Sequence, residues 1–325
     1  MKKKIRVGIV GYGNLGKGVE LALNQNPDFE LKAIFTRRDV CSFDENTKMV
    51  CISDVLDYKN EIDVIILCGG SANDLPVQGP MLSADFNTVD SYDNHGKIPE
   101  YFSKINEVAL ASGKVSLISA GWDPGLFSLN RLLSEAVLPQ GNAYTFWGKG
   151  VSQGHSDAIR RIKGVKKGIQ YTIPAEEAIE RVRTCENPNL AVCDKHKRIC
   201  YVVAEACEDI DRIEKEIKSI PDYFADYDTE VCFISEEEML KNHCKMPHGG
   251  FVISTGITGN CNKQRMEFSL ALESNPEFTS SILVAYARAV YRLSLEGKSG
   301  AFSVFDIPFA YLSPKTGEEL RKRLL

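Results

Sequence analysis

The sequence predicts an α/β protein that begins with a doubly wound parallel sheet. Strand and helix patterns alternate through the first 120 residues, as they do in sheets with helices on both faces. The run at 62–67 is apolar throughout, which is typical of a strand covered on both sides. From about residue 121 the strand patterns become longer and two-faced, which predicts a second domain of the α+β type.

The first strand pattern, at residues 5–10, runs into the glycine turn G-Y-G-N-L-G and then into a helical pattern. This order is the context of the dinucleotide-binding fingerprint. We expect Gly11 to take the tight turn, Gly13 to admit a pyrophosphate and Gly16 to let the helix pack on the strand. The N–H groups at the helix start would face the phosphates. We therefore predict a Rossmann-type nucleotide domain, with an ordinary glycine-rich turn as the alternative.

The second strand pattern, at 29–35, ends in Thr36, Arg37 and Arg38. A cofactor with a free ribose 2′-hydroxyl usually meets an acidic residue at this position, whereas a 2′-phosphate meets arginine. A hydroxyl and two guanidinium groups suit a phosphate. The strand end therefore predicts NADP rather than NAD, and the alternative is a solvated strand end without a ligand.

Further strands are expected at 48–52, 62–67, 87–92 and 115–118, with a helix at 99–112. Polar or small residues follow these strands, and ligands of doubly wound sheets bind at the carboxyl ends of the strands. We therefore place the cofactor along this edge. The predicted cofactor-binding residues are Gly11, Tyr12, Gly13, Asn14, Leu15, Thr36, Arg37, Arg38, Cys68, Gly69, Gly70, Ser71, Ala72, Ser91, Tyr92, Ala120, Gly121 and Pro124.

The second half predicts a mixed or antiparallel sheet that lines a substrate cleft or a subunit interface. Its expected strands are 144–147, 169–173, 199–204, 230–234, 251–255 and 264–272, and its expected helices are 157–162, 176–183 and 208–220. A long helix is predicted at 279–295. The expected domains are 1–120 for NADP and 121–275 for substrate binding and dimerisation, with 276–325 packed back on the first domain.

Composition and charge exclude several classes of protein. The 325 residues carry a net charge of -5, so no basic excess is present to neutralise nucleic-acid phosphates. No signal peptide or membrane-spanning run is visible. The ten cysteines include no C-x-x-C, which argues against a metal site. Unpaired thiols suit a reducing cytoplasm, and we expect all ten to act as small core hydrophobes.

The chain resembles the meso-diaminopimelate dehydrogenase family over nearly its whole length. The resemblance is carried by G-Y-G-N-L-G, F-T-R-R, D-S-Y-D-N-H, A-G-W-D-P-G, F-W-G-K-G-V-S-Q-G-H-S-D-A, Q-Y-T-I-P, H-K-R and M-P-H-G-G. It implies NADP-dependent oxidative deamination of the D-centre of meso-diaminopimelate to L-2-amino-6-oxopimelate and ammonia, in lysine biosynthesis. It also implies a homodimer, because the members of the family are homodimers, although some are hexamers.

The resemblance also implies roles for individual residues. Asp93 and Asp123 would hold the ammonium group of the D-centre, and either could accept its proton if burial raises the pKa of its carboxyl. The predicted substrate-binding residues are Trp122, Trp147, Gln153, Gly154, Thr172, Arg198, His248 and Asn275. Arg198, with Thr172 and His248, would clamp the carboxylate of the L-centre. His155 is a possible acid/base or orienting group.

Structural alternatives remain for the two acids. Asp123 could instead cap a helix that starts at Pro124, and Asp93 could close an Asx-turn. Two other functions also remain open. The first is a sugar or aldehyde dehydrogenase that uses NADP, against which the sequence has no E-K-P motif. The second is a regulator that senses NADP without catalysis, against which stand the polar groups at the strand ends.

Overall fold

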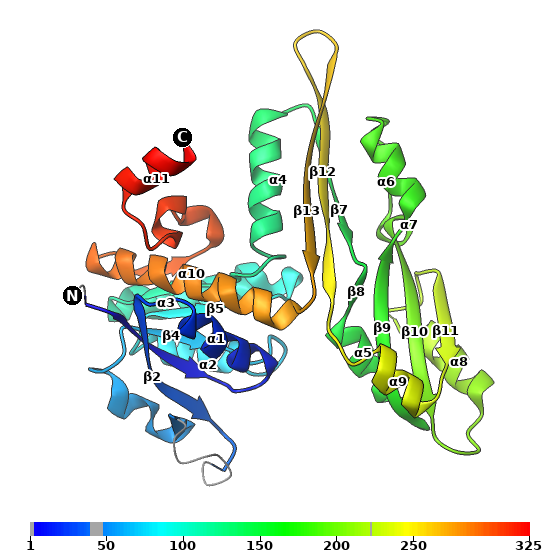
Figure 1. Cartoon of the computed structure of the whole chain (residues 1–325), viewed down its shortest axis with the longest axis horizontal. Coiled ribbons are helices and arrows are strands. Elements are labelled where there is room, and N and C mark those ends of the chain that lie inside the picture. Colours follow the sequence, from blue (N-terminus) through cyan, green and yellow to red (C-terminus); the bar gives the residue numbers. More distant parts are fainter. Residues whose placement is uncertain (1–2, 40–47, 222) are drawn as a thin grey trace. The chain divides into compact units, whose positions relative to one another are not determined.

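The computed structural model describes residues 3–39, 48–221 and 223–325. The chain forms two compact units, which are Met1–Leu129 with Pro276–Leu325, and Asn130–Asn275 (Figure 1). Within the described ranges no helix is long and apolar enough to cross a bilayer. The same residues bring no three His, Cys, Asp or Glu side chains together as a metal site.

The first unit is built on a seven-stranded sheet in the order β14-β6-β5-β4-β1-β2-β3. All of its strand pairs are parallel, so the predicted doubly wound α/β class is confirmed. The strands are β1 Ile5–Val10, β2 Phe29–Thr36, β3 Met49–Cys51, β4 Val64–Leu67, β5 Thr88–Asp90, β6 Val115–Leu117 and β14 Gly300–Phe302. The four residues of β4 are fully buried, as expected for a strand covered on both faces. The seventh strand, β14, comes from the end of the chain.

Helices cover this sheet, and the longest of them, α10, packs against residues near the start of the chain (Figure 1). The helices are α1 Asn14–Asn24, α2 Leu75–Ser83, α3 Ile98–Ser112, α10 Asn275–Leu295 and α11 Gly317–Leu324. In α10, Ser280 donates a hydrogen bond to the Leu15 carbonyl at 2.9 Å. Arg288, which is 2% exposed, donates to the Asp28 carboxylate at 2.6 Å. These buried contacts fix α10 against α1 and against the turn before β2.

The second unit contains two small sheets. One has the order β11-β10-β9-β8 and the other β13-β12-β7. The pairing of β10 with β11 is parallel and the remaining pairs are antiparallel, so one sheet is mixed and the other antiparallel, where a single mixed or antiparallel sheet was predicted. The strands are β7 Asn142–Trp147, β8 Gly150–Val151, β9 Val165–Pro174, β10 His196–Ala204, β11 Thr229–Phe233, β12 His248–Thr258 and β13 Asn262–Leu272. The helices are α5 Gln153–Arg160, α6 Glu176–Arg183, α7 Val192–Lys195, α8 Ile210–Ser219 and α9 Glu236–Asn242. Helix α4, Leu126–Val137, starts in the first unit and ends in the second.

Some local expectations were wrong. The strand expected at 48–52 ends at Cys51, and a 3-10 helix, Ile52–Tyr58, follows it. Helix α4 begins at Leu126 rather than at Pro124. The cysteines are not all core residues. Of the nine that the structure describes, only Cys200 is buried, and Cys41 lies outside the described residues. The exposed thiols are Cys51, Cys193, Cys207, Cys244 and Cys261.

Candidate active site

The glycine turn between β1 and α1 has the geometry of a dinucleotide fingerprint. Gly11 has a φ of +94°, a value that side chains rarely allow. A Cβ atom at Gly16 would lie 2.1 Å from the Gly11 carbonyl oxygen, so only glycine permits this close packing of helix on turn. A Cβ atom at Gly13 would meet nothing within 4 Å. The backbone at the start of α1 is therefore open to a phosphate at Gly13.

A cavity of about 240 Å³ opens beside this turn. It gathers eight of the predicted cofactor residues, namely Gly11, Tyr12, Gly13, Thr36, Arg37, Arg38, Cys68 and Gly69. The other predicted cofactor residues do not line it. These are Asn14, Leu15, Gly70, Ser71, Ala72, Ser91, Tyr92, Ala120, Gly121 and Pro124. The cavity fits the ribose and 2′-phosphate end of NADP, because both arginines meet the glycine turn there.

Two residues that were not predicted from the sequence also line this cavity, namely Asp74, which precedes α2, and Gln78 within α2. The Asp74 carboxylate accepts a hydrogen bond from the Gly70 N–H at 2.9 Å. The same carboxylate pairs with the Arg37 guanidinium at 2.9 Å. Gln78 lies one turn further along the helix and also faces the cavity. Arg37 is mostly exposed, so its guanidinium can turn from Asp74 to a phosphate.

A buried carboxylate, Asp90, organises the loops that carry the two predicted catalytic acids. It accepts hydrogen bonds from the Tyr92 N–H at 2.9 Å, the Ser119 N–H at 3.0 Å and the Tyr101 hydroxyl at 2.7 Å. Burial raises the pKa of the Asp90 carboxyl, and the three donors oppose this shift. Because Asp90 bonds to both loops, it holds the carboxyl ends of β5 and β6 together. Its role depends on the pairing of these strands, so no local pattern in the sequence predicts it.

The predicted catalytic acids stand on these two loops. Asp93 is exposed, and its N–H donates to the Ser71 hydroxyl at 3.2 Å. Asp123 is half-buried. The alternative role of Asp123 as cap of a helix starting at Pro124 is wrong, because no helix starts there. Beside it, Trp122 is 7% exposed and packs edge-on against Phe127 at 5.2 Å.

Arg198 and Thr172 meet in the second unit, on the paired strands β10 and β9. They are direct cross-strand partners, and the Arg198 guanidinium donates a hydrogen bond to the Thr172 hydroxyl. Arg198 is 6% exposed and lies over the Tyr227 ring at 4.1 Å. Burial lowers the pKa of its guanidinium. No carboxylate of the described residues forms an ion pair with Arg198. A buried cation without a counter-ion is costly, so this site calls for an anionic ligand.

Two of the remaining predicted substrate residues of this unit bond to Met246, which precedes β12. Gln153 donates to the Met246 sulfur at 3.2 Å, and the Asn275 N–H donates to the Met246 carbonyl at 3.0 Å. A Cβ atom at Gly150 would lie 2.4 Å from the His248 ring, so this glycine makes room for the imidazole. Gly154 stands at the start of α5, where a Cβ atom would meet open space.

Trp147 is held by His196, which was not among the predicted site residues. The backbone N–H of Trp147 donates to His196 Nε2 at 2.8 Å, and the indole and imidazole rings stack with their centroids 5.1 Å apart. Since Nε2 accepts this bond, the imidazole carries its proton on Nδ1, which lies 3.3 Å from the Val192 carbonyl. Burial, reinforced by Arg198, lowers the pKa of His196 to about 3. The neutral ring therefore fixes the orientation of Trp147.

The depressed pKa of His196 predicts a loss of stability in acid. Below pH 6.5 the unfolded chain binds a proton at this histidine, and the folded chain does not. His196 alone therefore lowers the free energy of unfolding by up to about 1.4 kcal/mol per pH unit as the pH falls from 6.5 towards 3. A glutamine can still accept the Trp147 N–H. In urea unfolding at pH 6.5, 5.5 and 4.5, the free energy of unfolding should therefore fall less steeply with pH for His196→Gln than for the parent. Equal slopes of this free energy against pH would contradict the assignment.

His155 is also neutral at physiological pH. Its Nδ1 lies 2.7 Å from the Ser152 hydroxyl, and its buried Nε2 has no partner among the described residues. Burial, with a smaller contribution from Arg198, lowers the pKa of His155 to about 4. A neutral imidazole suits the predicted orienting role better than that of a proton donor.

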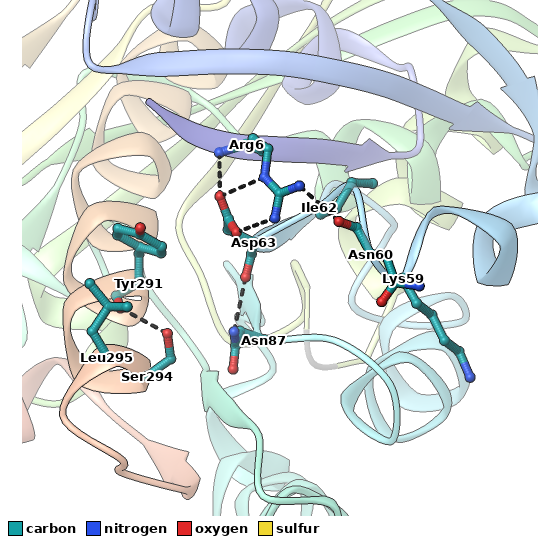
Figure 2. A pocket seen from close by; sticks show the side chains of 9 residues that line it. All are labelled: Arg6, Lys59, Asn60, Ile62, Asp63, Asn87, Tyr291, Ser294 and Leu295. Carbon is teal, nitrogen blue, oxygen red and sulfur yellow. Dashed lines mark hydrogen bonds and ion pairs between the residues drawn. The ribbon is translucent and has the colours of Figure 1, made fainter. Parts of the chain in front are cut away.

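A larger cavity of about 290 Å³ lies at the amino ends of the parallel strands (Figure 2). Its Arg6 side chain makes two hydrogen bonds to the Asp63 carboxylate, at 2.7 and 3.1 Å, and one to the Asn60 carbonyl at 2.8 Å. Asn87 donates to the Asp63 carbonyl at 2.9 Å. These polar groups bond to one another, so the cavity's role is structural and ligand binding is better placed at the opposite edge of the sheet.

Known proteins match this chain over nearly its whole length. The family model for the diaminopimelic acid dehydrogenase C-terminal domain matches residues 121–274. The meso-diaminopimelate D-dehydrogenase of Ureibacillus thermosphaericus is 63% identical over 99% of both chains. The solved structure of Corynebacterium glutamicum DAP dehydrogenase in complex with DAP is 46% identical, with a TM-score of 0.94 over 99% of this chain and 100% of that one. An engineered D-amino acid dehydrogenase bound to NADP+ is 45% identical, with a TM-score of 0.89 over the same shares.

Proposed function

The chain belongs to the meso-diaminopimelate dehydrogenase family, and from this premise we propose that it oxidises the D-centre of meso-2,6-diaminopimelate with NADP. The products are L-2-amino-6-oxopimelate, ammonia and NADPH, and the reaction belongs to lysine biosynthesis. The observation that carries the proposal is the buried Arg198, which has Thr172 beside it and no carboxylate of the described residues paired to it. Such a site is suited to a substrate that has a second carboxylate far from the reacting carbon.

We assign the predicted site residues to the two ends of the substrate. Asp93 and Asp123 hold the ammonium group of the D-centre, and one of them takes its proton. Arg198, Thr172 and His248 hold the carboxylate of the L-centre. Trp122, Trp147, Gln153, Gly154 and Asn275 make the further substrate contacts.

The chemical step needs no covalent nucleophile from the protein. When bound, NADP accepts the hydride from the α-carbon. The amine of the substrate is thereby oxidised to an imine, which water hydrolyses to the keto acid and ammonia. The protein orients the α-hydrogen and limits competing reactions. Asp90 supports this positioning by holding the loops of both acids.

The cofactor fits the residues of the first unit. The open backbone at Gly13 and the start of α1 suit the pyrophosphate. Thr36, Arg37 and Arg38 suit the 2′-phosphate, since they line one cavity with the glycine turn. Apart from Asn14 and Leu15, which lie at the start of α1, the predicted cofactor residues outside that cavity are proposed to contact the nicotinamide half. They follow β4, β5 and β6, at the edge where such sheets bind ligands.

We predict that meso-diaminopimelate is oxidised and that the L,L isomer is not. Arg198 grips the L-centre, so only a D-centre at the other end presents its hydrogen to the cofactor. The test is NADPH formation with each isomer at equal concentration, with a panel of sugars and aldehydes as controls. Equal turnover of the L,L isomer would show the orientation to be wrong. Binding of NADP without turnover of any substrate would favour the regulator instead.

We also propose a homodimer in a reducing, cytoplasmic compartment. The second unit exposes Leu132, Leu133 and Val137 on α4, and β13 is an edge strand with half-buried apolar residues. Exposed apolar surface of this kind marks protein interfaces. All nine described cysteines are free thiols, which suits reducing conditions. Sedimentation of the pure protein as a monomer at micromolar concentration would contradict the dimer.

A further inference from the structure

Gln170 is a fully buried amide in the middle of β9. The backbone N–H of Gln170 donates to the Ser156 hydroxyl at 3.0 Å, and its backbone carbonyl accepts from the Ser152 N–H at 3.1 Å. Its cross-strand partner is Cys200, which is also fully buried. Among the described residues the side-chain oxygen has no hydrogen-bond partner. An apolar side chain would avoid the cost of this unpaired atom, so packing alone does not explain a glutamine here.

The other end of the same amide reaches the proposed carboxylate clamp. Gln170 Nε2 donates to the Thr172 hydroxyl oxygen at 3.3 Å, and Arg198 donates to the same oxygen. A hydroxyl has two acceptor positions and one proton to donate. Both acceptor positions are therefore occupied. Within the described part of the chain, no acceptor takes the hydroxyl proton of Thr172.

We propose that Gln170 is a positioning residue that turns Thr172 into a hydrogen-bond donor for the distal carboxylate of the substrate. This inference rests on the proposed function. Gln170 does not touch the substrate itself. With Gln170 and Arg198 both donating to the hydroxyl oxygen, its proton points to the ligand, where it joins the guanidinium in holding the anion. Without Gln170 the Thr172 hydroxyl can rotate, and the carboxylate clamp loses a preorganised hydrogen-bond donor.

The test is a double-mutant cycle on KM for meso-diaminopimelate. The four enzymes are the parent, Gln170→Met, Thr172→Val and the double variant. Methionine has a similar length and no donor. We expect Gln170→Met to raise KM on the order of tenfold, with kcat within about twofold of the parent. In the Thr172→Val background the same change should have no further effect, because Gln170 acts only through that hydroxyl. Thermal melting of each variant checks the fold, and Gln170→Leu serves as a second apolar variant.

Other results would overturn the inference. If KM rose by the same factor with and without Thr172, Gln170 would support the fold rather than the hydroxyl. An unchanged KM in Gln170→Met would mean that the side-chain oxygen of Gln170 faces Thr172, so that the Thr172 hydroxyl donates its proton to Gln170 and not to the substrate. Failure of both apolar variants to fold would make the amide structural. Failure of the proposed function is a separate outcome, since the parent would then form no NADPH with meso-diaminopimelate.

Discussion

Arg198→Met is expected to raise KM for meso-diaminopimelate by roughly 30- to 150-fold, which corresponds to about 2–3 kcal/mol for a charged hydrogen-bonded contact. Arg198 is buried against Thr172 and Tyr227 without an ion-pair partner among the described residues, so its strongest proposed contact is the substrate. The effect falls mainly on KM, since the guanidinium does not touch the reacting bond. A smaller loss of kcat is expected where the α-carbon is misplaced.

A substrate without a second carboxylate isolates this contact. D-Norleucine has an apolar side chain in place of the distal amino acid group, so Arg198→Met should harm its turnover much less, or improve it. An arginine facing an apolar side chain is left desolvated and unpaired. Arg212→Met is the matched control, because Arg212 pairs with Glu208 and Glu216. An equal fractional loss of kcat/KM for both substrates would make Arg198 structural.

Arg37→Ala is expected to lower kcat/KM for NADP by roughly tenfold to a hundredfold and to leave NAD nearly unaffected. Loss of a charged contact to the 2′-phosphate accounts for about 1.5–3 kcal/mol. Asp74 adds to this loss. Its carboxylate pairs with Arg37 and lines the same cavity. Without the arginine it would repel a phosphate, and it could accept a hydrogen bond from the 2′-hydroxyl of NAD.

The double variant Arg37→Ala with Asp74→Asn separates the two effects. Removing the uncovered carboxylate should restore part of the NADP activity that Arg37→Ala loses. NAD measured with every variant is the internal control. Comparable kcat/KM for NAD and NADP in the parent would contradict the cofactor assignment. So would an Arg37→Ala enzyme that keeps the parental preference for NADP.

The sequence predicted what local patterns determine. The glycine turn and the buried strands each have a pattern of their own, and the α/β class followed from them. Helix α2 had no such pattern, because Pro76, Gly79 and Pro80 interrupt it. Asp74 and Gln78 were missed with it. The pairing of β14 with β6 joins residues far apart in the sequence, which no local pattern can show.

The residues of the candidate site likewise fall into those that a local pattern predicts and those that depend on contacts in the folded chain. Residues at strand ends were predicted as site residues because parallel strands bring those ends to one edge. The partnership of Arg198 with Thr172 depends on the register of β10 against β9, which is set by the segment between them. His196 and Asp90 act by holding other groups, and their hydrogen bonds exist only in the folded chain. The resemblance named the residues that would touch the substrate and did not name these supporting residues.

Isotope transfer tests the central claim most directly. Two samples of meso-diaminopimelate, one deuterated at the D-centre α-carbon and one at the L-centre, are each turned over with NADP. The NADPH formed is then analysed by mass spectrometry. Oxidation at the D-centre predicts one deuterium in the cofactor from the first sample and none from the second. Deuterium transferred from the L-centre would contradict the account.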